Sequence, residues 1–139
     1  MPNLNSAQAE ELAKHYAGLS LSTAKYRFNN WDKLTEAKRK QLSEQSAELG
    51  KQSDQCIKLA ATLIMEDVKA DLAKIKIITN EIQTTIEKIS SVQKVVNVIA
   101  AALDLGAAII SKVPLDIVKK IEDLNKAWNN ASKNLNKSR

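Results

Sequence analysis

Few residues of this 139-residue chain are able to do chemistry, and they are scattered along it. There is one histidine, His15, and one cysteine, Cys56, so the chain cannot build a disulfide framework or a metal site from several Cys or His ligands. His15 stands alone beside Tyr16 and is expected to be a surface or capping residue. Cys56 falls within a helical apolar pattern and is expected to be a small buried side chain.

An acidic cluster is the other group that could do chemistry. Asp67 and Asp71 are four residues apart, with Glu66 beside them, so two carboxylates would share one helical face and could bind a cation. Lys69 and Lys74 lie close by, which favours a solvated face with ion pairs. We therefore expect no metal site there.

Catalytic motifs are absent from the sequence. It contains no nucleophile elbow, no glycine-rich phosphate loop and no Glu-x-x-His pair of the kind that builds di-iron bundles. We predict a protein that is not an enzyme and that takes no cofactor, metal or small-molecule substrate.

The composition favours helices. Three Gly and two Pro in the whole chain are too few for collagen, for low-complexity linkers or for most turn-rich β folds, and 44% apolar residues suffice for a core. The apolar positions follow intervals of three, four and seven residues. We predict an all-α fold with a single domain, residues 1–139: an elongated antiparallel bundle of three to five helices with coiled-coil-like heptad packing.

Residues 1–31 are predicted to form an N-terminal helix followed by an aromatic connector. Asn5 can cap the helix, and Gln8, three residues later, can complete a capping box. Gly18 and Ser20 suggest where this helix ends.

Residues 32–113 are predicted to form a long helical hairpin or a set of bent helices. From 51 to 105 the sequence contains no Gly and no Pro, but two heptad series in this span are offset. The offset suggests a stutter or bend between about 60 and 71, or alternatively a turn near 79–80.

Residues 114–139 are predicted to form an amphipathic helix with a basic tail. Pro114 suits the first helical position and Asp116 the first turn. The net charge of the chain is +5, and a count over broad segments places the excess after residue 90. Such a tail suits an anionic lipid or an acidic partner.

An apolar stripe runs through the second half of the chain and is the predicted interaction surface. Its residues recur every seven positions and continue at intervals of three and four in the last helix. We predict that it carries helix–helix contacts with a partner or a second copy. This interaction stripe comprises Ile75, Ile82, Ile89, Val96, Leu103, Ile110, Ile117, Ile121, Leu124 and Trp128.

The most apolar run, residues 95–111, is 17 residues long, which is near the lower limit of about 17–25 for a bilayer span. It is the buried central helix of a soluble bundle, a segment that enters a membrane conditionally, or a segment that spans lipid in the resting protein. Asp104 interrupts it; if buried, Asp104 would need a partner or a raised pKa and could act as a pH-sensitive latch, whereas on an exposed edge it would be ordinary. The candidate membrane residues are Val95, Val96, Val98, Ile99, Leu103, Asp104, Leu105, Gly106, Ile109 and Ile110.

This run, set between the amphipathic segments 75–94 and 117–135, resembles the α-helical pore-forming toxins. The resemblance covers less than half of the chain and is one of style, so no functional residue is carried over. It implies a soluble bundle that hides an apolar element able to enter a membrane.

The segment 25–31 interleaves aromatic and basic residues. Tyr26, Phe28 and Trp31 are candidates for an interface with a membrane or a partner. Alternatively, Phe28 and Trp31 close the end of the bundle while Tyr26 and Arg27 face water. Nucleic acid binding is disfavoured because the basic residues do not form a dense patch.

The function suggested by these patterns is non-enzymatic helix–helix association with a protein partner or with itself. The alternative is a membrane-active protein whose segment 95–111 inserts into lipid. No basic start followed by an apolar run is present near Met1, so we expect cytoplasmic synthesis, with secretion or membrane association by a signal-independent route left open.

Overall fold

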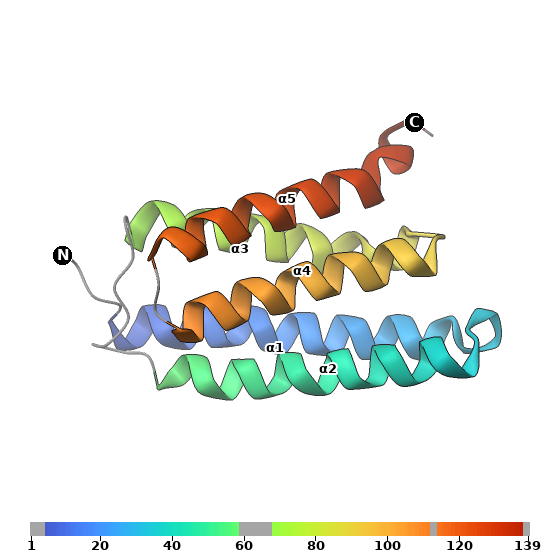
Figure 1. Ribbon diagram of the computed structural model, residues 1–139, viewed down its shortest axis with the longest axis horizontal. Helices are drawn as coiled ribbons and strands as arrows, with labels where there is room; N and C mark the ends of the chain where they lie inside the picture. The colour runs from blue at the N-terminus through green and yellow to red at the C-terminus, as the bar shows by residue number, and fades with distance from the viewer. Residues whose placement is uncertain (1–4, 59–67, 112–113, 138–139) are drawn as a thin grey trace.

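Figure 1 shows the computed structural model, which describes residues 5–58, 68–111 and 114–137. These residues form five α-helices and two short 3₁₀ turns, and none of them is in a strand. The all-α helical bundle predicted from the sequence is therefore confirmed. The helices are α1 (Ser6–Asn29), α2 (Glu36–Ile57), α3 (Val68–Thr85), α4 (Val92–Ser111) and α5 (Pro114–Lys137), and the 3₁₀ turns are Trp31–Lys33 and Ile86–Lys88.

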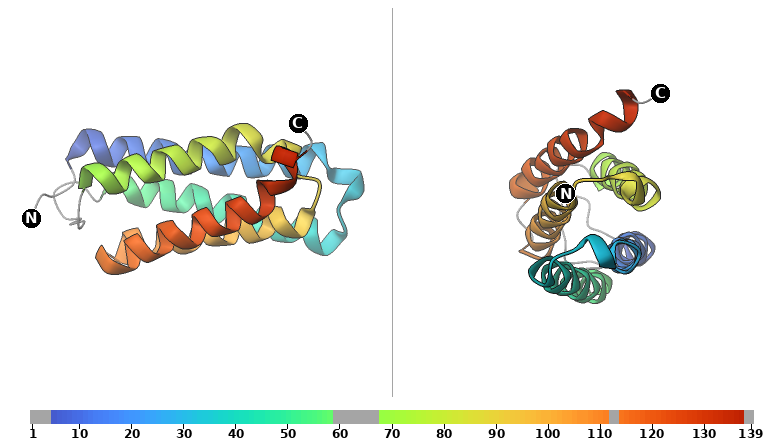
Figure 2. Two further views of the ribbon diagram at one scale, coloured as in Figure 1. Left: turned by 90° about the horizontal axis from the view of Figure 1, so that it is seen from above. Right: turned by 90° about the vertical axis from the view of Figure 1, so that its right-hand side faces the viewer.

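The five helices lie along one long axis, and each runs antiparallel to the one before it (Figure 1). The closest pairs are α1 with α2 and α4 with α5, and further contacts join α2 to α4 and α1 to α3. Seen along the axis, α4 lies between α2 and α5, while α1 and α3 occupy the other side (Figure 2). The most apolar helix is thus flanked by α2 and α5.

The N-terminal helix begins as predicted but does not end as predicted. The Asn5 side chain accepts a hydrogen bond from the Gln8 backbone N–H at 2.8 Å, and the Gln8 side chain accepts one from the Asn5 N–H at 2.9 Å. The expected end near Gly18 is wrong, because α1 continues to Asn29. Gly18 faces Gln83 of α3, whose amide would overlap any Cβ placed at residue 18. This glycine serves close helix packing rather than termination.

The long span without Gly or Pro contains a break between α3 and α4 that the sequence did not mark. α3 runs to Thr85, so the turn suggested near Thr79 is wrong; the Thr79 hydroxyl instead donates to the Ile75 carbonyl inside the helix at 2.7 Å. α4 starts after Ser91, whose hydroxyl accepts from the Lys94 N–H at 3.3 Å and so acts as a weak cap. The bend suggested between 60 and 71 falls mostly outside the described residues.

The interaction stripe packs inside the single chain. Eight of its ten residues are buried, and Leu103 and Ile110 are half-buried. The heptad periodicity therefore builds the core of this bundle, and little of the stripe is exposed to a partner. The buried members are Ile75, Ile82, Ile89, Val96, Ile117, Ile121, Leu124 and Trp128.

Small polar residues set the register of α1 against α2. The hydroxyls of Ser20 and Ser46 donate to each other's backbone carbonyls at 2.7 and 2.8 Å, and Ser53 donates to the Ala13 carbonyl at 2.6 Å. Ala13 lies seven residues before Ser20, and Ser53 lies seven residues after Ser46, so the contacts repeat in one antiparallel register. Their short side chains let the two backbones approach closely.

Three side chains hold α4 by its backbone, and we call Tyr16, Gln45 and Gln52 the carbonyl clamp. The Tyr16 hydroxyl donates to the Ala102 carbonyl at 2.8 Å. The amide N–H groups of Gln45 and Gln52 donate to the carbonyls of Val96 and Leu103, at 3.2 and 2.9 Å. Both glutamines are more than nine-tenths buried, and their amide oxygens have no hydrogen-bond partner among the described residues. Directional polar bonds, besides apolar packing, therefore fix α4 in the bundle.

We predict that Gly106 and Gln52 are energetically coupled. A Cβ at Gly106 would overlap the Gln52 amide, so Gly106→Ala should displace that side chain and break its bond to Leu103. The stability lost with this hydrogen bond offsets the stability of about 1 kcal/mol that replacing Gly with Ala adds inside a helix. In a Gln52→Ala background the same substitution should stabilise the protein by about 1 kcal/mol. Urea unfolding of the four proteins measures the coupling, and additive effects would contradict it.

Candidate functional site

At the end of the bundle where α1 connects to α2, the aromatic side chains do not have the orientations that one of the sequence-based alternatives predicted. Tyr26 is buried, and its hydroxyl donates to the Ile89 carbonyl at 3.2 Å. Phe28 is 78% exposed and Trp31 is 41% exposed. The interpretation in which Phe28 and Trp31 close the bundle while Tyr26 faces water is therefore wrong. The reason is that α1 stays helical to Asn29, which turns position 26 inward and position 28 outward.

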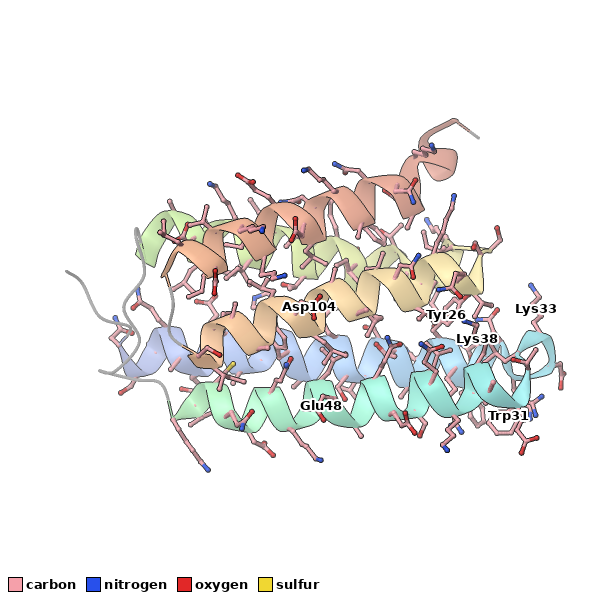
Figure 3. The ribbon with its side chains drawn as sticks, in the orientation of Figure 1. Tyr26, Trp31, Lys33, Lys38, Glu48 and Asp104 are labelled. Atoms are coloured by element: carbon pink, nitrogen blue, oxygen red, sulfur yellow. The ribbon has the colours of Figure 1, made fainter. Side chains whose placement is uncertain are left out.

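An apolar strip follows the outer face of α1 toward this end. Leu21 is 71% exposed, and Ala24 and Phe28 follow it at helical spacing on the same face. Trp31 follows in the 3₁₀ turn just beyond α1, at the end of the bundle (Figure 3). We call Leu21, Ala24, Phe28 and Trp31 the tip surface. Large apolar side chains that are exposed near one another are typical of an interaction site.

Two arginines fix the position of Trp31. The guanidinium carbons of Arg27 and Arg39 lie 4.9 and 4.2 Å from the centre of the indole ring, within the range of cation–π contacts. Arg39 donates from Nε and Nη2 to the Trp31 carbonyl at 3.0 and 2.6 Å. Arg27 donates from Nε to the Arg39 carbonyl at 2.8 Å and so ties the end of α1 to the start of α2. The indole is held in place while two-fifths of it stays exposed.

The sequence segment that contains Phe28 and Trp31 is strongly basic. Residues 25–40 contain six basic and two acidic residues, a net charge of +4, which equals the net charge of residues 91–139; the rest of the chain is net negative, so the total is +5. The count over broad segments hid this excess, because Glu10, Glu11, Glu44 and Glu48 fall within the first 50 residues. A narrower window would have found it. The six basic residues are Lys25, Arg27, Lys33, Lys38, Arg39 and Lys40.

The C-terminal part of the chain, where the sequence predicted an excess of positive charge, extends toward the same end of the bundle. α5 runs toward the end that holds the tip surface (Figure 1), and Lys126 and Lys133 are exposed along it. An open hollow of about 460 Å³ lies beside Trp31. Its lining includes the basic residues Arg27, Arg39 and Lys40 and also Glu36 and Glu44.

Among the described helices, α4 alone is long and apolar enough to cross a membrane by length and composition, and the buried core helix of a soluble protein would meet the same criterion. It contains all ten candidate membrane residues. Seven of these are buried, and the other three are the half-buried Leu103 and Ile110 and the exposed Asp104. Its exposed face is a narrow stripe of small and polar residues. The stripe consists of Gln93, Asn97, Ala100, Asp104, Ala107 and Ser111.

Asp104 lies on this exposed stripe (Figure 3), so the hypothesis of a buried pH-sensitive latch is wrong. We expect Asp104→Asn to change the free energy of unfolding by less than about 0.5 kcal/mol, as is usual for exposed positions. Chemical denaturation at pH 7 measures this difference. A shift above 1 kcal/mol in either direction would show that Asp104 has a partner that stabilises or strains the fold.

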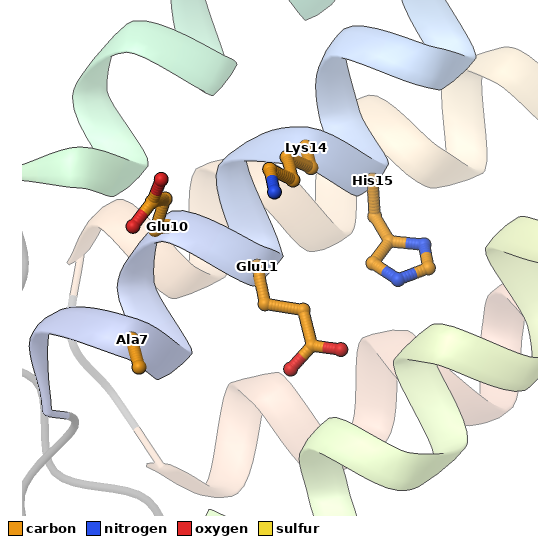
Figure 4. A pocket seen from close by; sticks show the side chains of 5 residues that line it. All are labelled: Ala7, Glu10, Glu11, Lys14 and His15. Carbon is orange, nitrogen blue, oxygen red and sulfur yellow. The ribbon is translucent and has the colours of Figure 1, made fainter.

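His15 is a contact between helices rather than the surface or capping residue that the sequence suggested. Its Nδ1 lies 2.8 Å from the Thr79 hydroxyl of α3, and that hydroxyl donates its proton to the Ile75 carbonyl. When the Thr79 hydroxyl donates to the Ile75 carbonyl, Nδ1 of the neutral ring carries the hydrogen and donates to Thr79. Figure 4 shows His15 and Glu11 projecting from α1 toward α3, beside an open hollow of about 420 Å³.

The surroundings of His15 do not form a catalytic arrangement. Glu11 is paired with Lys76 at 2.5 Å, and the hydrogen bond from Lys76 lowers the pKa of that carboxyl. The Thr79 hydroxyl is committed to the backbone of its own helix. The described residues contain no group of three His, Cys, Asp or Glu side chains that could hold a metal ion. The chemistry available at this contact is proton uptake by one imidazole.

We predict that acid weakens the fold through His15. Burial lowers the pKa of His15 below its ordinary value of 6.5, opposed by Glu11 and aided by Lys76. Between these two pKa values the unfolded chain binds more protons than the folded one, so stability falls as the pH drops through 6.5. The melting temperature should decrease from pH 7.5 to 5.5, and His15→Gln should remove most of that decrease. An equal decrease in the variant would contradict this assignment.

Two other residues singled out from the sequence differ in outcome. Asp71 is buried, with 4% of its surface exposed, so the solvated acidic face predicted there is wrong at this residue. Glu66 and Asp67 lie outside the described residues.

Cys56 is fully buried, as predicted, and burial raises the pKa of its thiol to about 12. The thiolate needed for reactivity is therefore absent at neutral pH.

Comparisons of this chain with models of protein families, with curated proteins and with solved structures find no match.

Proposed function

We propose that this protein is a non-enzymatic, membrane-active helical bundle in which α4 enters the lipid bilayer. The observation that carries the proposal is the nature of α4. It is a 20-residue, mostly apolar helix whose exposed face bears Ala100 and Ala107, the polar side chains of Gln93, Asn97 and Ser111, and a single carboxylate, that of Asp104. Its length and apolar content favour insertion into lipid, and Asp104 is the acidic group that insertion must carry into the bilayer.

The packing of the bundle supports this proposal over association through the interaction stripe. Eight stripe residues are already buried within one chain, so a partner could use them only if the helices first separated. Separation of that kind would also release α4 from Tyr16, Gln45 and Gln52. A bilayer would then supply the apolar surroundings that α4 loses. Association with a protein partner or a second copy is the weaker proposal and would use surfaces outside the stripe.

The test is dye release from lipid vesicles, at neutral and at acidic pH, with charges added to α4. Ala100 and Ala107 are exposed beside Asp104, so Ala100→Asp and Ala107→Asp should leave the soluble bundle folded. Each Asp costs about 2.5–3.5 kcal/mol at the centre of an inserted helix, so each should reduce insertion about 100-fold. The matched control is Ala73→Asp, at an exposed position of α3.

We expect the wild type and Ala73→Asp to release dye and the two α4 variants to release little. Equal release by all four proteins would show that α4 does not insert. If the wild type released no dye at either pH, the proposed function would be wrong. Cytoplasmic synthesis and a signal-independent route to the membrane remain part of this proposal.

A further inference from the structure

One end of the bundle combines exposed apolar side chains with a concentration of positive charge. Leu21, Phe28 and Trp31 face solvent there, on the outer side of α1 and just past its end. The 16 residues from 25 to 40, which include Phe28 and Trp31, have a net charge of +4. We propose that the tip surface docks this protein on the headgroups of an anionic membrane, an inference that rests on the proposed membrane function and names its point of first contact.

The aromatic residues suit the boundary between lipid headgroups and acyl chains. Tryptophan and other amphipathic rings favour this boundary because one part of the ring is apolar and another part can form hydrogen bonds. Trp31 is held by Arg27 and Arg39 yet remains two-fifths exposed, so it is presented with little loss of side-chain freedom on binding. Phe28 and Leu21, exposed on the outer face of α1, can enter the outer part of the acyl layer.

The cations of the segment 25–40 favour an anionic surface. Lys25, Lys33 and Lys40 are exposed, and Arg27 and Arg39 are half-buried against Trp31. Each basic residue near an anionic bilayer strengthens binding about fivefold at physiological ionic strength. Asp32 and Glu36 are the two acidic residues in the segment 25–40 and weaken this attraction only in part.

The shape of the tip surface fits a lipid surface better than a protein partner. The strip is a single file of side chains on the convex side of a helix and its turn, whereas a stable protein interface buries about 800 Å² on each partner. A deformable bilayer can surround such a projection. The end of α5, which carries the exposed Lys133, lies at the same end of the bundle and adds to the attraction (Figure 1).

The experiment measures binding of the full chain to vesicles of phosphatidylcholine alone and of phosphatidylcholine with phosphatidylglycerol, by flotation at low and at physiological salt. We expect tighter binding to the anionic vesicles and weaker binding at higher salt. Phe28→Ser should reduce partition about tenfold or more. Lys33→Gln combined with Lys40→Gln should reduce it about 25-fold, from about fivefold for each lysine.

Matched controls distinguish the effect of the tip surface from the effect of removing any exposed apolar side chain or any exposed charge. Ile77→Ser removes an apolar side chain that is 64% exposed on α3, and Lys51→Gln with Lys74→Gln removes two exposed lysines of α2 and α3. These control variants should bind anionic vesicles nearly as well as the wild type.

Fluorescence tests whether Trp31 itself contacts lipid. In a Trp128→Phe background, which removes the buried indole, the emission of Trp31 should shift to shorter wavelength on anionic vesicles and should be quenched by brominated lipid.

The possible outcomes distinguish this inference from the proposed function. If the tip variants bind and release dye like the wild type, the tip surface is not the docking site, while the membrane function stands. If binding depends on the tip surface but no dye is released, the tip surface is the docking site and α4 does not insert. If Phe28→Ser changes the molar mass in solution and leaves lipid binding intact, the surface pairs two copies of the chain and the inference is wrong. No binding by the wild type overturns both.

Discussion

Replacing Ile82 with Asp is expected to unfold this protein at room temperature. Ile82 lies in α3 with none of its surface exposed, in the middle of the core. The substitution removes its apolar contacts and places a carboxylate where water cannot reach it. Together these effects should cost more than about 4 kcal/mol, a large part of the roughly 5–15 kcal/mol by which domains of this size are stable. Circular dichroism at 222 nm during thermal and urea unfolding measures the loss.

The control for this variant is the same substitution five residues earlier. Ile77 is also an isoleucine of α3, but 64% of its surface is exposed. Ile77→Asp should therefore change the free energy of unfolding by less than about 0.5 kcal/mol. If the two variants were equally stable, the assignment of the stripe to the core of one chain would be wrong.

The second large effect is expected at Tyr16, which is fully buried and forms part of the carbonyl clamp. Tyr16→Ala should destabilise the bundle by about 3–5 kcal/mol, because it leaves a large cavity and removes the hydrogen bond to Ala102. Burial raises the pKa of the Tyr16 hydroxyl well above its ordinary value of 10.0, so the group stays protonated and remains a donor. Urea unfolding and near-ultraviolet circular dichroism report the change.

Tyr16→Phe separates the hydroxyl from the ring. It keeps the volume of the side chain and removes only the bond to the Ala102 carbonyl, so it should cost about 1 kcal/mol. The difference between the two variants gives the contribution of packing. A Phe variant as unstable as the Ala variant would mean that α4 is held mainly by this polar bond.

The fold class could be predicted because it depends on local periodicity. Apolar residues seven apart, such as Ile75 and Ile82, fall on one side of a helix, and both are fully buried. The capping box of Asn5 and Gln8 is equally local, since both partners lie within four residues. Periodicity does not reveal which surface covers the apolar stripe. The sequence alone therefore could not show whether the stripe packs within this chain or against a partner.

Other features depend on which helices meet, and these were missed. Gly18 looked like a helix end because nothing in the sequence placed Gln83 against it. His15 looked solitary because its partner, Thr79, is 64 residues away. The orientations of Tyr26 and Phe28 were reversed because the helix was expected to end before them.

The tip surface was recognised only in part. Its aromatic residues Phe28 and Trp31 were candidates from the sequence, whereas Leu21 and Ala24 were placed in a connector instead of on the outer face of a continuing helix. The charge around it required a window of 16 residues to become visible. Contacts such as that between Arg39 and Trp31 need the turn at 31–33, which no pattern in the sequence predicted.

All three donors of the carbonyl clamp precede α4 in the chain, and this order matters while the protein is being made. Tyr16 and Gln52 belong to α1 and α2, whose serine contacts repeat in one register without help from later residues. When the ribosome releases the apolar residues of α4, the surface that receives them has therefore already been synthesised. Chains emerge at about 5–20 residues per second, so the α1–α2 pair has seconds in which to close first. The order of the elements thus places the helices of the carbonyl clamp, α1 and α2, ahead of α4 during synthesis.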